Sequence, residues 1–268
     1  MKVLLVNNRY KEHTAKMAEK LAKKLEKLNI EVETEDSNIG NDPELIIVLG
    51  GDGTILRAAR QYAYKNLPVM GVNMGNVGFL STIEVDELDM CLGQLLCGDY
   101  KLDQRMMLNI DIYEENKLVD SLYCINELVI RSNSTRMVTL NLAIDGEKSG
   151  IYRGDGLIIA SPTGSTAYSL SAGGPICDPQ LDAFIITPIA SHFICKRPTV
   201  LSSDLLLELT PVEYQDAIIC LDGQVLRELN VHTRIKIKKA EYRLKLVNMK
   251  KWSFLYNLEN RLKRLEGS

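Results

Sequence analysis

The sequence has little of several features that mark particular classes of protein. Its 268 residues carry a formal net charge of −3, so no excess of positive charge indicates binding to nucleic acid. The six cysteines form no Cys-x-x-Cys pair, and the three histidines are scattered, which argues against a zinc site. No apolar run reaches the roughly 20 residues of a membrane-spanning helix. We therefore expect a soluble cytoplasmic protein without a signal peptide, with no membrane partner and no nucleic-acid partner.

What is present has the balance of a globular protein, with 46% hydrophobic and 25% charged residues. Up to about residue 98, strand-like apolar runs alternate with helical patterns, for example a strand at 45–49 between helices at 14–28 and from about Thr54 onwards. This alternation predicts an α/β domain whose parallel sheet binds ligands where its strands end.

The pattern changes near Tyr100. Residues 107–247 hold many short strand-like runs and few helical patterns, and turn signals such as Asp145-Gly146 and Asp222-Gly223 punctuate them. We predict an α/β domain over residues 1–98, followed by a predominantly β domain, a two-layer sandwich, over residues 99–251. Apolar residues at helical spacing in 249–265 predict a final helix, which could pack on either domain.

The strongest local signal is Gly-Gly-Asp-Gly-Thr at residues 50–54, directly after the strand at 45–49. Glycines let a ligand approach the backbone, and the amides at the start of a helix attract anions, so the turn suits a phosphate group. It is neither a Walker A loop nor a Gly-x-Gly-x-x-Gly fingerprint. Asp52 is unexpected beside phosphate, and local reasoning leaves three roles open: metal ligand, helix cap, or acceptor of a proton from an attacking hydroxyl.

A second signal lies between residues 153 and 175, where a strand runs into Pro-Thr-Gly-Ser-Thr and a short helix rich in hydroxyls. Neutral hydroxyls beside an aromatic ring suit a nucleoside, although a surface loop can be rich in Ser and Thr for solubility alone. Asn126-Glu127 could bind the vicinal hydroxyls of a ribose or form an ordinary turn. Asp222-Gly223-Gln224 is most simply a hairpin turn.

Four stretches together resemble a known family. The turn at 50–54, a glycine-rich stretch at 71–80, Asn126-Glu127 and the segment 155–175 occur in the order seen in NAD kinases. The resemblance covers about residues 1–265. The long hydroxyl-rich segment is specific to that family, whereas the first turn is shared with diacylglycerol and sphingosine kinases and, loosely, with 6-phosphofructokinases. The resemblance implies an α/β nucleotide domain, a β-rich domain that binds NAD, a C-terminal segment, 252–268, returning to the first domain, and a cytosolic homodimer or homotetramer.

The resemblance also implies roles for the matching residues. Asp52 would be the base facing the 2′-hydroxyl of the adenosine ribose of NAD. The other matching residues would bind substrate: Gly53, Arg57, Asn73 and Phe79 in the first domain, and Asn126, Glu127, Arg136, Arg153, Asp155, Thr163, Thr166, Ala167, Tyr168, Ser171 and Gln224 in the second.

Within that set, Gly53 and Arg57 would lie near phosphate, and Asn126-Glu127 would hold ribose hydroxyls. Asp155 would meet the nicotinamide side with Arg153 close by, residues 166–171 would line the adenine and ribose pocket, and Gln224 would contribute from the β domain. Arg136 follows a loop that is about one residue shorter than in familiar members.

The implied reaction transfers a phosphoryl group from ATP, another nucleoside triphosphate or polyphosphate to NAD, giving NADP, with Mg²⁺ or another divalent metal held mainly by the phosphates. Two departures concern the donor: Asp178 stands where a basic residue or His is common, and Asn7-Asn8-Arg9 matches the usual first loop only loosely. The alternatives are a lipid kinase sharing the turn, against which the polar segment 163–171 argues, and a non-catalytic dinucleotide sensor, against which Asp52 argues.

Overall fold

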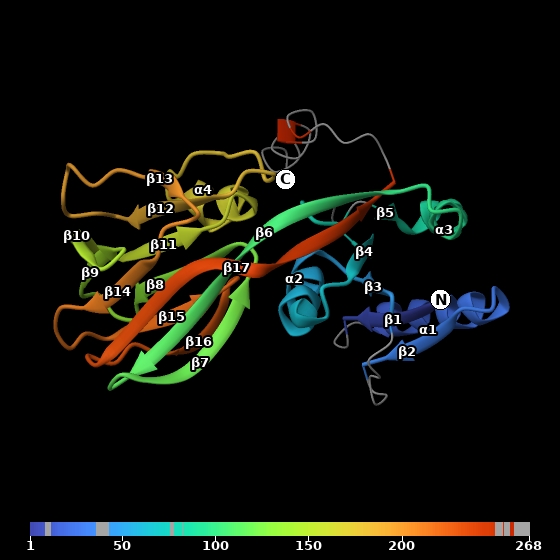
Figure 1. Cartoon of the computed structure of the whole chain (residues 1–268), viewed down its shortest axis with the longest axis horizontal. Helices are drawn as coiled ribbons and strands as arrows, with labels where there is room; N and C mark the ends of the chain where they lie inside the picture. The colour runs from blue at the N-terminus through green and yellow to red at the C-terminus, as the bar shows by residue number, and fades with distance from the viewer. Residues whose placement is uncertain are drawn as a thin grey trace. The chain divides into compact units, whose positions relative to one another are not determined.

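A computed structural model describes residues 1–8, 12–35, 43–75, 78–81, 83–249, 254 and 258–259. The chain divides into two compact units. Unit 1 comprises Met1–Gln104 together with the chain from Leu244 on, and unit 2 comprises Arg105–Arg243 (Figure 1). The domain boundaries expected from the sequence, 98/99 and 251/252, stay a prediction. None of the helices in the described part of the chain has the length and hydropathy of a membrane span.

Unit 1 is an α/β unit whose strands run side by side in a parallel sheet, in the order β2-β1-β3-β4 with β5 next to β4 (Figure 1). Its elements, in chain order, are β1 (Lys2–Asn7), α1 (Glu12–Lys27), β2 (Glu31–Thr34), β3 (Leu45–Leu49), α2 (Asp52–Tyr62), η1 (Ala63–Lys65), β4 (Pro68–Asn73), β5 (Ile83–Glu84), η2 (Val85–Glu87) and α3 (Leu88–Leu96).

The sequence explains why this sheet lies inside unit 1. All five residues of β3 are buried, as expected of a central parallel strand covered on both faces. In α2 the buried residues include Ile55, Ala58, Ala59 and Tyr62, which recur at three- and four-residue spacing and so form one apolar face. The predicted strand at 45–49 and the predicted α/β order are confirmed.

Unit 2 is a sandwich of two sheets. One sheet has the order β10-β9-β14-β17-β6-β7, and the other is six-stranded, in the order β13-β12-β11-β8-β15-β16. The bounds of these elements are β6 (Lys101–Glu114), β7 (Lys117–Cys124), β8 (Glu127–Ser132), β9 (Val138–Ile144), β10 (Glu147–Gly154), β11 (Gly156–Ala160), η3 (Thr163–Thr166), α4 (Tyr168–Ser171), β12 (Ala183–Ile189), β13 (Thr199–Ser202), β14 (Leu207–Pro211), β15 (Ala217–Leu221), β16 (Gln224–Glu228) and β17 (Thr233–Asn248).

Apolar side chains from both sheets form the core of the sandwich. Ile110 and Leu140 from the first sheet belong to the same buried cluster as Phe184 and Ile219 from the second. Burial along β9 and along the first half of β17 alternates, which is the period of a strand with one face in a core. The predicted two-layer β domain is therefore confirmed.

The last strand is longer than the sequence indicates. Only 233–237 reads as a strand, yet β17 continues to Asn248, where Lys245 and Leu246 pair in parallel with Pro68 and Val69 of β4. Local sequence does not predict this extension because the pairing partner lies far away along the chain. The helix expected over 249–265 falls almost wholly outside the described residues.

Candidate functional site

The turn that carries Asp52 joins the carboxyl end of β3 to the start of α2. The N–H of Gly50 donates to the carbonyl oxygen of Val72 at 3.0 Å, which holds the turn against the end of the neighbouring strand β4. A Cβ atom on Gly50 would lie 2.4 Å from Oγ1 of Thr54, so only glycine fits there. Gly51 occupies the N-cap of α2, and the helix-cap role considered for Asp52 is therefore wrong.

The carboxylate of Asp52 faces the second glycine-rich stretch. It accepts hydrogen bonds from the backbone N–H groups of Phe79 at 2.5 Å, Leu80 at 3.0 Å and Ser81 at 3.3 Å. Gly78 lies directly against it, since a Cβ atom there would stand 1.9 Å from Oδ1 of Asp52. Asp52 therefore joins the two glycine-rich turns of unit 1, and its carboxylate is held in a fixed orientation between them.

Unpaired polar atoms lie close to this arrangement. Asn73, at the end of β4, is 2% exposed, and its Nδ2 donates to the carbonyl oxygen of Gly75 at 2.9 Å. Its Oδ1 and the Oγ of Ser81 are buried and have no hydrogen-bond partner among the described residues. Buried polar groups are normally satisfied, so atoms left unpaired at the carboxyl end of β4 and beside Asp52 suit a polar ligand.

Asn126 and Glu127 form a corner in unit 2, where the chain leaves β7 in one sheet and enters β8 in the other. The carbonyl oxygen of Asn126 accepts from the N–H of Ser161 at 2.9 Å. A Cβ atom on Gly164 would stand 2.1 Å from that same oxygen, so the Pro-Thr-Gly turn packs closely on the corner. The structure therefore brings Asn126-Glu127 and the start of the hydroxyl-rich segment together.

Glu127 is an unusual carboxyl group, because it is only 3% exposed and its Oε2 has no hydrogen-bond partner within the described part of the chain. Burial is the main reason why the pKa of Glu127 is raised to about 8; the neighbouring charge of Asp222 also raises it, while a hydrogen bond from the backbone of Tyr168 lowers it. At neutral pH this side chain is mainly protonated, so it can donate as well as accept a hydrogen bond.

The hydroxyl-rich segment separates into structural and available groups. The buried Ser165 accepts from the N–H of Cys177 at 3.0 Å, and the Oγ of Ser169 lies 2.8 Å from Oγ1 of Thr187. In contrast, Oγ1 of Thr163 is buried without a partner among the described residues. Tyr168 is 40% exposed, and Ser171 is also exposed. The groups free to meet a ligand therefore lie at Thr163 and along 166–171.

Two family models and many known proteins match this chain. Residues 34–100 match the family model described as the ATP-NAD kinase N-terminal domain, and residues 125–249 match the ATP-NAD kinase C-terminal domain. The NAD kinase of Natranaerobius thermophilus is 36% identical over 275 residues, which cover 96% of both chains.

The chain belongs to the NAD kinase family.

Other relatives and solved structures support the same assignment. The NAD kinase of Lachnoclostridium phytofermentans is 39% identical over 236 residues, covering 85% of this chain and 83% of that one. The structure of an Archaeoglobus fulgidus NAD kinase in complex with ATP matches with a TM-score of 0.76 and 27% identity, covering 98% of this chain and 99% of that one. Yeast NADH kinase complexed with NADH shares the fold, with a TM-score of 0.89 at 23% identity over 98% of this chain and 87% of that one. Members of the family are phosphotransferases that act on an alcohol group, and this chain is such an enzyme.

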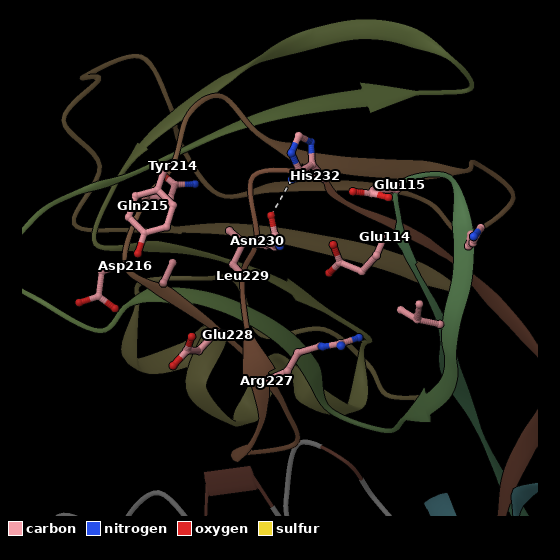
Figure 2. A pocket seen from close by; sticks show the side chains of 13 residues that line it. Glu114, Glu115, Tyr214, Gln215, Asp216, Arg227, Glu228, Leu229, Asn230 and His232 are labelled. Atoms are coloured by element: carbon pink, nitrogen blue, oxygen red, sulfur yellow. Dashed lines mark hydrogen bonds between the residues drawn. The ribbon is translucent and has the colours of Figure 1, made fainter.

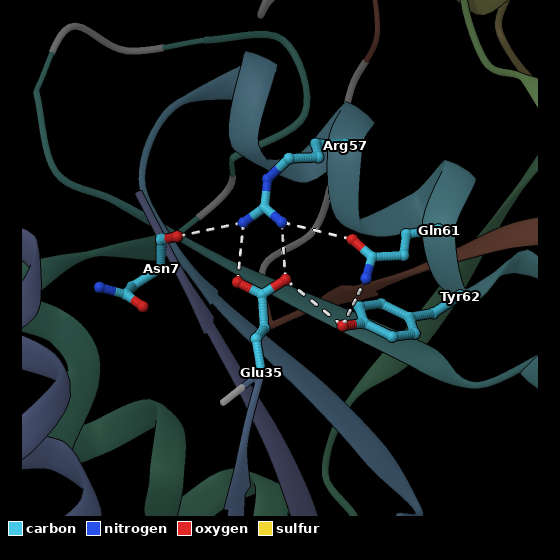
Figure 3. A network of polar contacts seen from close by, with 5 residues as sticks. All are labelled: Asn7, Glu35, Arg57, Gln61 and Tyr62. Carbon is cyan, nitrogen blue, oxygen red and sulfur yellow. Dashed lines mark hydrogen bonds and ion pairs between the residues drawn. The ribbon is translucent and has the colours of Figure 1, made fainter. Parts of the chain in front are cut away.

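Arg57, which the family resemblance places near phosphate, is engaged within unit 1. Its guanidinium makes two hydrogen bonds to the carboxylate of Glu35, at 2.6 and 2.9 Å, and a third to the carbonyl oxygen of Asn7 at 3.1 Å (Figure 3). Tyr62 donates to the same carboxylate at 3.3 Å, and burial is the main reason why the pKa of Tyr62 is raised to about 12. Arg57 therefore joins α2 to the ends of β1 and β2, and its contact with phosphate stays a prediction.

Three predicted residues lie away from the Asn126-Glu127 corner within unit 2. Asp155 precedes β11, whereas Ser161 follows it, and six residues of extended chain span about 20 Å. Arg153, at the end of β10, and Arg136, in the turn after β8, lie at the same end of the sandwich as Asp155. The carbonyl oxygen of Asp155 accepts from the N–H of Ser132. A single copy of unit 2 does not bring these three residues to Glu127, and their roles stay predictions.

One residue at the corner carries no sequence signal of function. Asp222, in the β15–β16 turn beside Gln224, has a φ of 46°, and Gly223 has a φ of 76°, so the predicted hairpin turn is confirmed. Its carboxylate, however, accepts from the backbone N–H groups of Ile125, Asn126 and Glu127. Asp-Gly is common in hairpins for conformational reasons alone, so only the folded chain reveals this second contact.

A cavity of about 730 Å³ opens elsewhere on unit 2, and Glu114, Tyr214, Arg227, Asn230 and His232 are among the residues that line it (Figure 2). None of the residues that the sequence singles out lines this cavity. Arg227 pairs with Asp120 at 2.8 Å, and the N–H of His232 donates to Oδ1 of Asn230. The cavity is therefore separate from the candidate site.

Proposed function

We propose that this chain phosphorylates the 2′-hydroxyl of the adenosine ribose of NAD, giving NADP, with ATP or another phosphorylated donor. The observation that carries the proposal is Asp52, a carboxylate held by three backbone amides at the carboxyl end of a parallel strand, next to glycines that admit phosphate. Family membership supplies the substrate class, because the relatives are NAD kinases and one related structure holds ATP.

Asp52 would act as the base at the acceptor hydroxyl. A ribose hydroxyl is a far weaker acid than a carboxylic acid, so Asp52 would not deprotonate it in the ground state. Phosphoryl transfer has a loose transition state in which the bond to the nucleophile forms late. Asp52 would orient the hydroxyl and take its proton only as the new O–P bond forms, and the amides of residues 79–81 would hold the carboxylate in place for that step.

Unit 2 would supply most of the contacts to NAD. Glu127 and Thr163, whose buried oxygens lack partners among the described residues, would hydrogen-bond ribose hydroxyls together with Asn126. The partly exposed ring of Tyr168 offers an aromatic face to a base. A largely uncharged Glu127 suits a ligand that carries a negative pyrophosphate, because it adds no like charge.

Mg²⁺ fits the residues present only as an ion brought by the donor. No group of three or more His, Cys, Asp or Glu in the described ranges is placed to hold a metal ion. The three N–H groups on Asp52 direct their hydrogens to the oxygens that a cation would need. When bound to the donor phosphates, Mg²⁺ would neutralise their charge and make a nearby carboxylate tolerable.

A change of Asp52 to Asn tests the proposal. The amide keeps the size of the side chain and one acceptor oxygen but cannot take a proton at neutral pH. We expect NAD affinity to stay within a few-fold and turnover to fall by about 10² to 10⁴, measured as NADP formation in an assay coupled to an NADP-dependent dehydrogenase. Near-normal turnover of the variant would exclude the base role.

The same assay separates the alternatives. A lipid kinase would phosphorylate diacylglycerol and leave NAD unchanged, and a sensor would bind NAD without forming NADP. Replacing ATP by another nucleoside triphosphate or by polyphosphate identifies the donor.

We further propose a cytoplasmic homodimer or homotetramer. Exposed apolar side chains on and near β10, including Ile151, Phe193 and Ile194, support assembly, because a monomer gains nothing by exposing them. Light scattering coupled to size-exclusion chromatography measures the number of subunits.

A further inference from the structure

We propose that Asp222 is a positioning residue for nucleotide binding: its carboxylate fixes the backbone of the Asn126-Glu127 corner and thereby directs both side chains at the ligand. The proposal rests on the proposed function for its ligand, NAD. It goes beyond the resemblance, which assigns no role to Asp222.

The carboxylate of Asp222 accepts hydrogen bonds from three successive backbone amides. Oδ1 of Asp222 accepts from the N–H of Ile125 at 3.2 Å, of Asn126 at 2.7 Å and of Glu127 at 3.3 Å, and Oδ2 accepts from Ile125 at 3.1 Å. In return, the N–H of Asp222 donates to the carbonyl oxygen of Glu127 at 3.0 Å. Hydrogen bonds to an ionised acceptor are stronger than neutral ones, so this set holds the corner firmly.

The corner needs such a hold because the two residues that precede β8 belong to neither sheet. Residues 125 and 126 lie between β7 and β8, where the chain passes from one layer of the sandwich to the other. No strand partner fixes their amides, and unpaired buried amides are costly. On the opposite side, Ser161 donates its N–H to Asn126 and its hydroxyl to the carbonyl oxygen of Ile125, at 2.9 and 2.5 Å. Ser161 and Asp222 therefore hold the corner from opposite sides, and of the two only Asp222 carries a charge.

The charge of Asp222 also affects the pKa of the Glu127 side chain. Apart from burial, the group that raises the pKa of Glu127 is Asp222, and the only opposing contribution is the backbone hydrogen bond from Tyr168. Asp222 therefore disfavours a second negative charge at the corner. A neutral hairpin residue such as Asn would tolerate the positive φ equally well, but it would carry neither the charge nor the second acceptor oxygen.

The test compares Asp222→Ala and Asp222→Asn with a matched control, Asp145→Asn. Asp145-Gly146 is also an Asp-Gly turn with positive φ at both residues, and Asp145 accepts a backbone hydrogen bond at 2.8 Å, but from Leu206, away from the corner. The measurements are kcat and the KM for NAD and for ATP, folding by circular dichroism, and titration of the Glu127 carboxyl by ¹³C NMR.

We expect Asp222→Ala to raise the KM for NAD at least tenfold, with kcat and the KM for ATP within threefold, because positioning affects ground-state binding. Asp222→Asn keeps one acceptor oxygen, so its KM for NAD should lie between those of the wild type and Asp222→Ala. In this variant the titration midpoint of Glu127 should move to lower pH. The control should match the wild type in every readout.

A KM for NAD within twofold of wild type in Asp222→Ala, an unmoved Glu127 midpoint in Asp222→Asn, or failure of Asp222→Asn to fold would overturn the proposal. If the wild type itself forms no NADP, the proposed function fails instead, and the NMR titration still reads the effect of Asp222 on Glu127.

Discussion

Gly78 offers the sharpest test of how the two glycine turns of unit 1 cooperate. An alanine Cβ at this position would stand 1.9 Å from Oδ1, 2.3 Å from Cγ and 2.6 Å from Oδ2 of Asp52. Real Cβ atoms essentially never come within 3.0 Å of a heavy atom outside their own and the adjoining residues, so the carboxylate must move by about 1 Å or more in Gly78→Ala. A displacement of this size at a reacting group costs about 10²-fold in rate.

The expected effects on catalysis and on stability are measured separately. The atoms that collide are the end of one side chain, and moving it weakens the hydrogen bonds from residues 79–81, so we expect the free energy of unfolding to fall by about 1–3 kcal/mol. A loss of about 10² in kcat/KM corresponds to about 2.7 kcal/mol of transition-state stabilisation. Because the residues of unit 2 are untouched, NAD affinity should stay within a few-fold of wild type.

The assay is NADP formation, with urea unfolding and calorimetric NAD binding on the same preparations. Gly75→Ala is the matched control, since a Cβ atom there meets nothing within 4 Å, and it should retain activity. Wild-type turnover in Gly78→Ala would refute the reasoning, because Asp52 would then tolerate displacement and could not be the oriented base. Equal losses in both variants would show that the loop backbone matters, rather than the contact with Asp52.

Two further predictions concern buried carboxyl groups. The pKa of Glu127 is about 8 in the fold, against the ordinary value of 4.5. Folding therefore favours its protonated form, and the stability that this form allows is lost as pH rises from 4.5 to 8. Glu127→Gln should therefore gain stability over wild type between pH 5 and pH 8 in urea unfolding, and a difference that does not depend on pH would contradict the raised pKa. The side chain of Glu35 is 3% exposed and pairs with Arg57, which is 33% exposed. Glu35→Gln should therefore lower the free energy of unfolding by about 1–3 kcal/mol after discounting for the exposure of Arg57. As a control, Glu12→Gln breaks the exposed pair with Lys16 and should change the free energy of unfolding by less than about 0.5 kcal/mol.

Much of the fold could be predicted because it follows from local pattern. The apolar run at 45–49 became β3 with the expected bounds, and two of the short strand-like runs within 107–247, at 138–144 and 217–221, became β9 and β15. The extension of β17 to Asn248 could not be predicted in this way, since its pairing with β4 joins residues about 180 positions apart.

In the candidate site, too, some features follow from local sequence and others only from the folded chain. The sequence by itself determined the chemistry: a carboxylate among glycines, a run of hydroxyls and the family to which they belong, because turn preferences and motif spacing are local properties of the chain. Only the tertiary structure decided what orients these groups. The amides of 79–81 on Asp52, the carboxylate of Asp222 on Asn126-Glu127, and Glu35 on Arg57 are hydrogen bonds between segments distant in sequence. Such contacts leave no periodic signal, since any loop amide can donate to any carboxylate that the fold brings within reach.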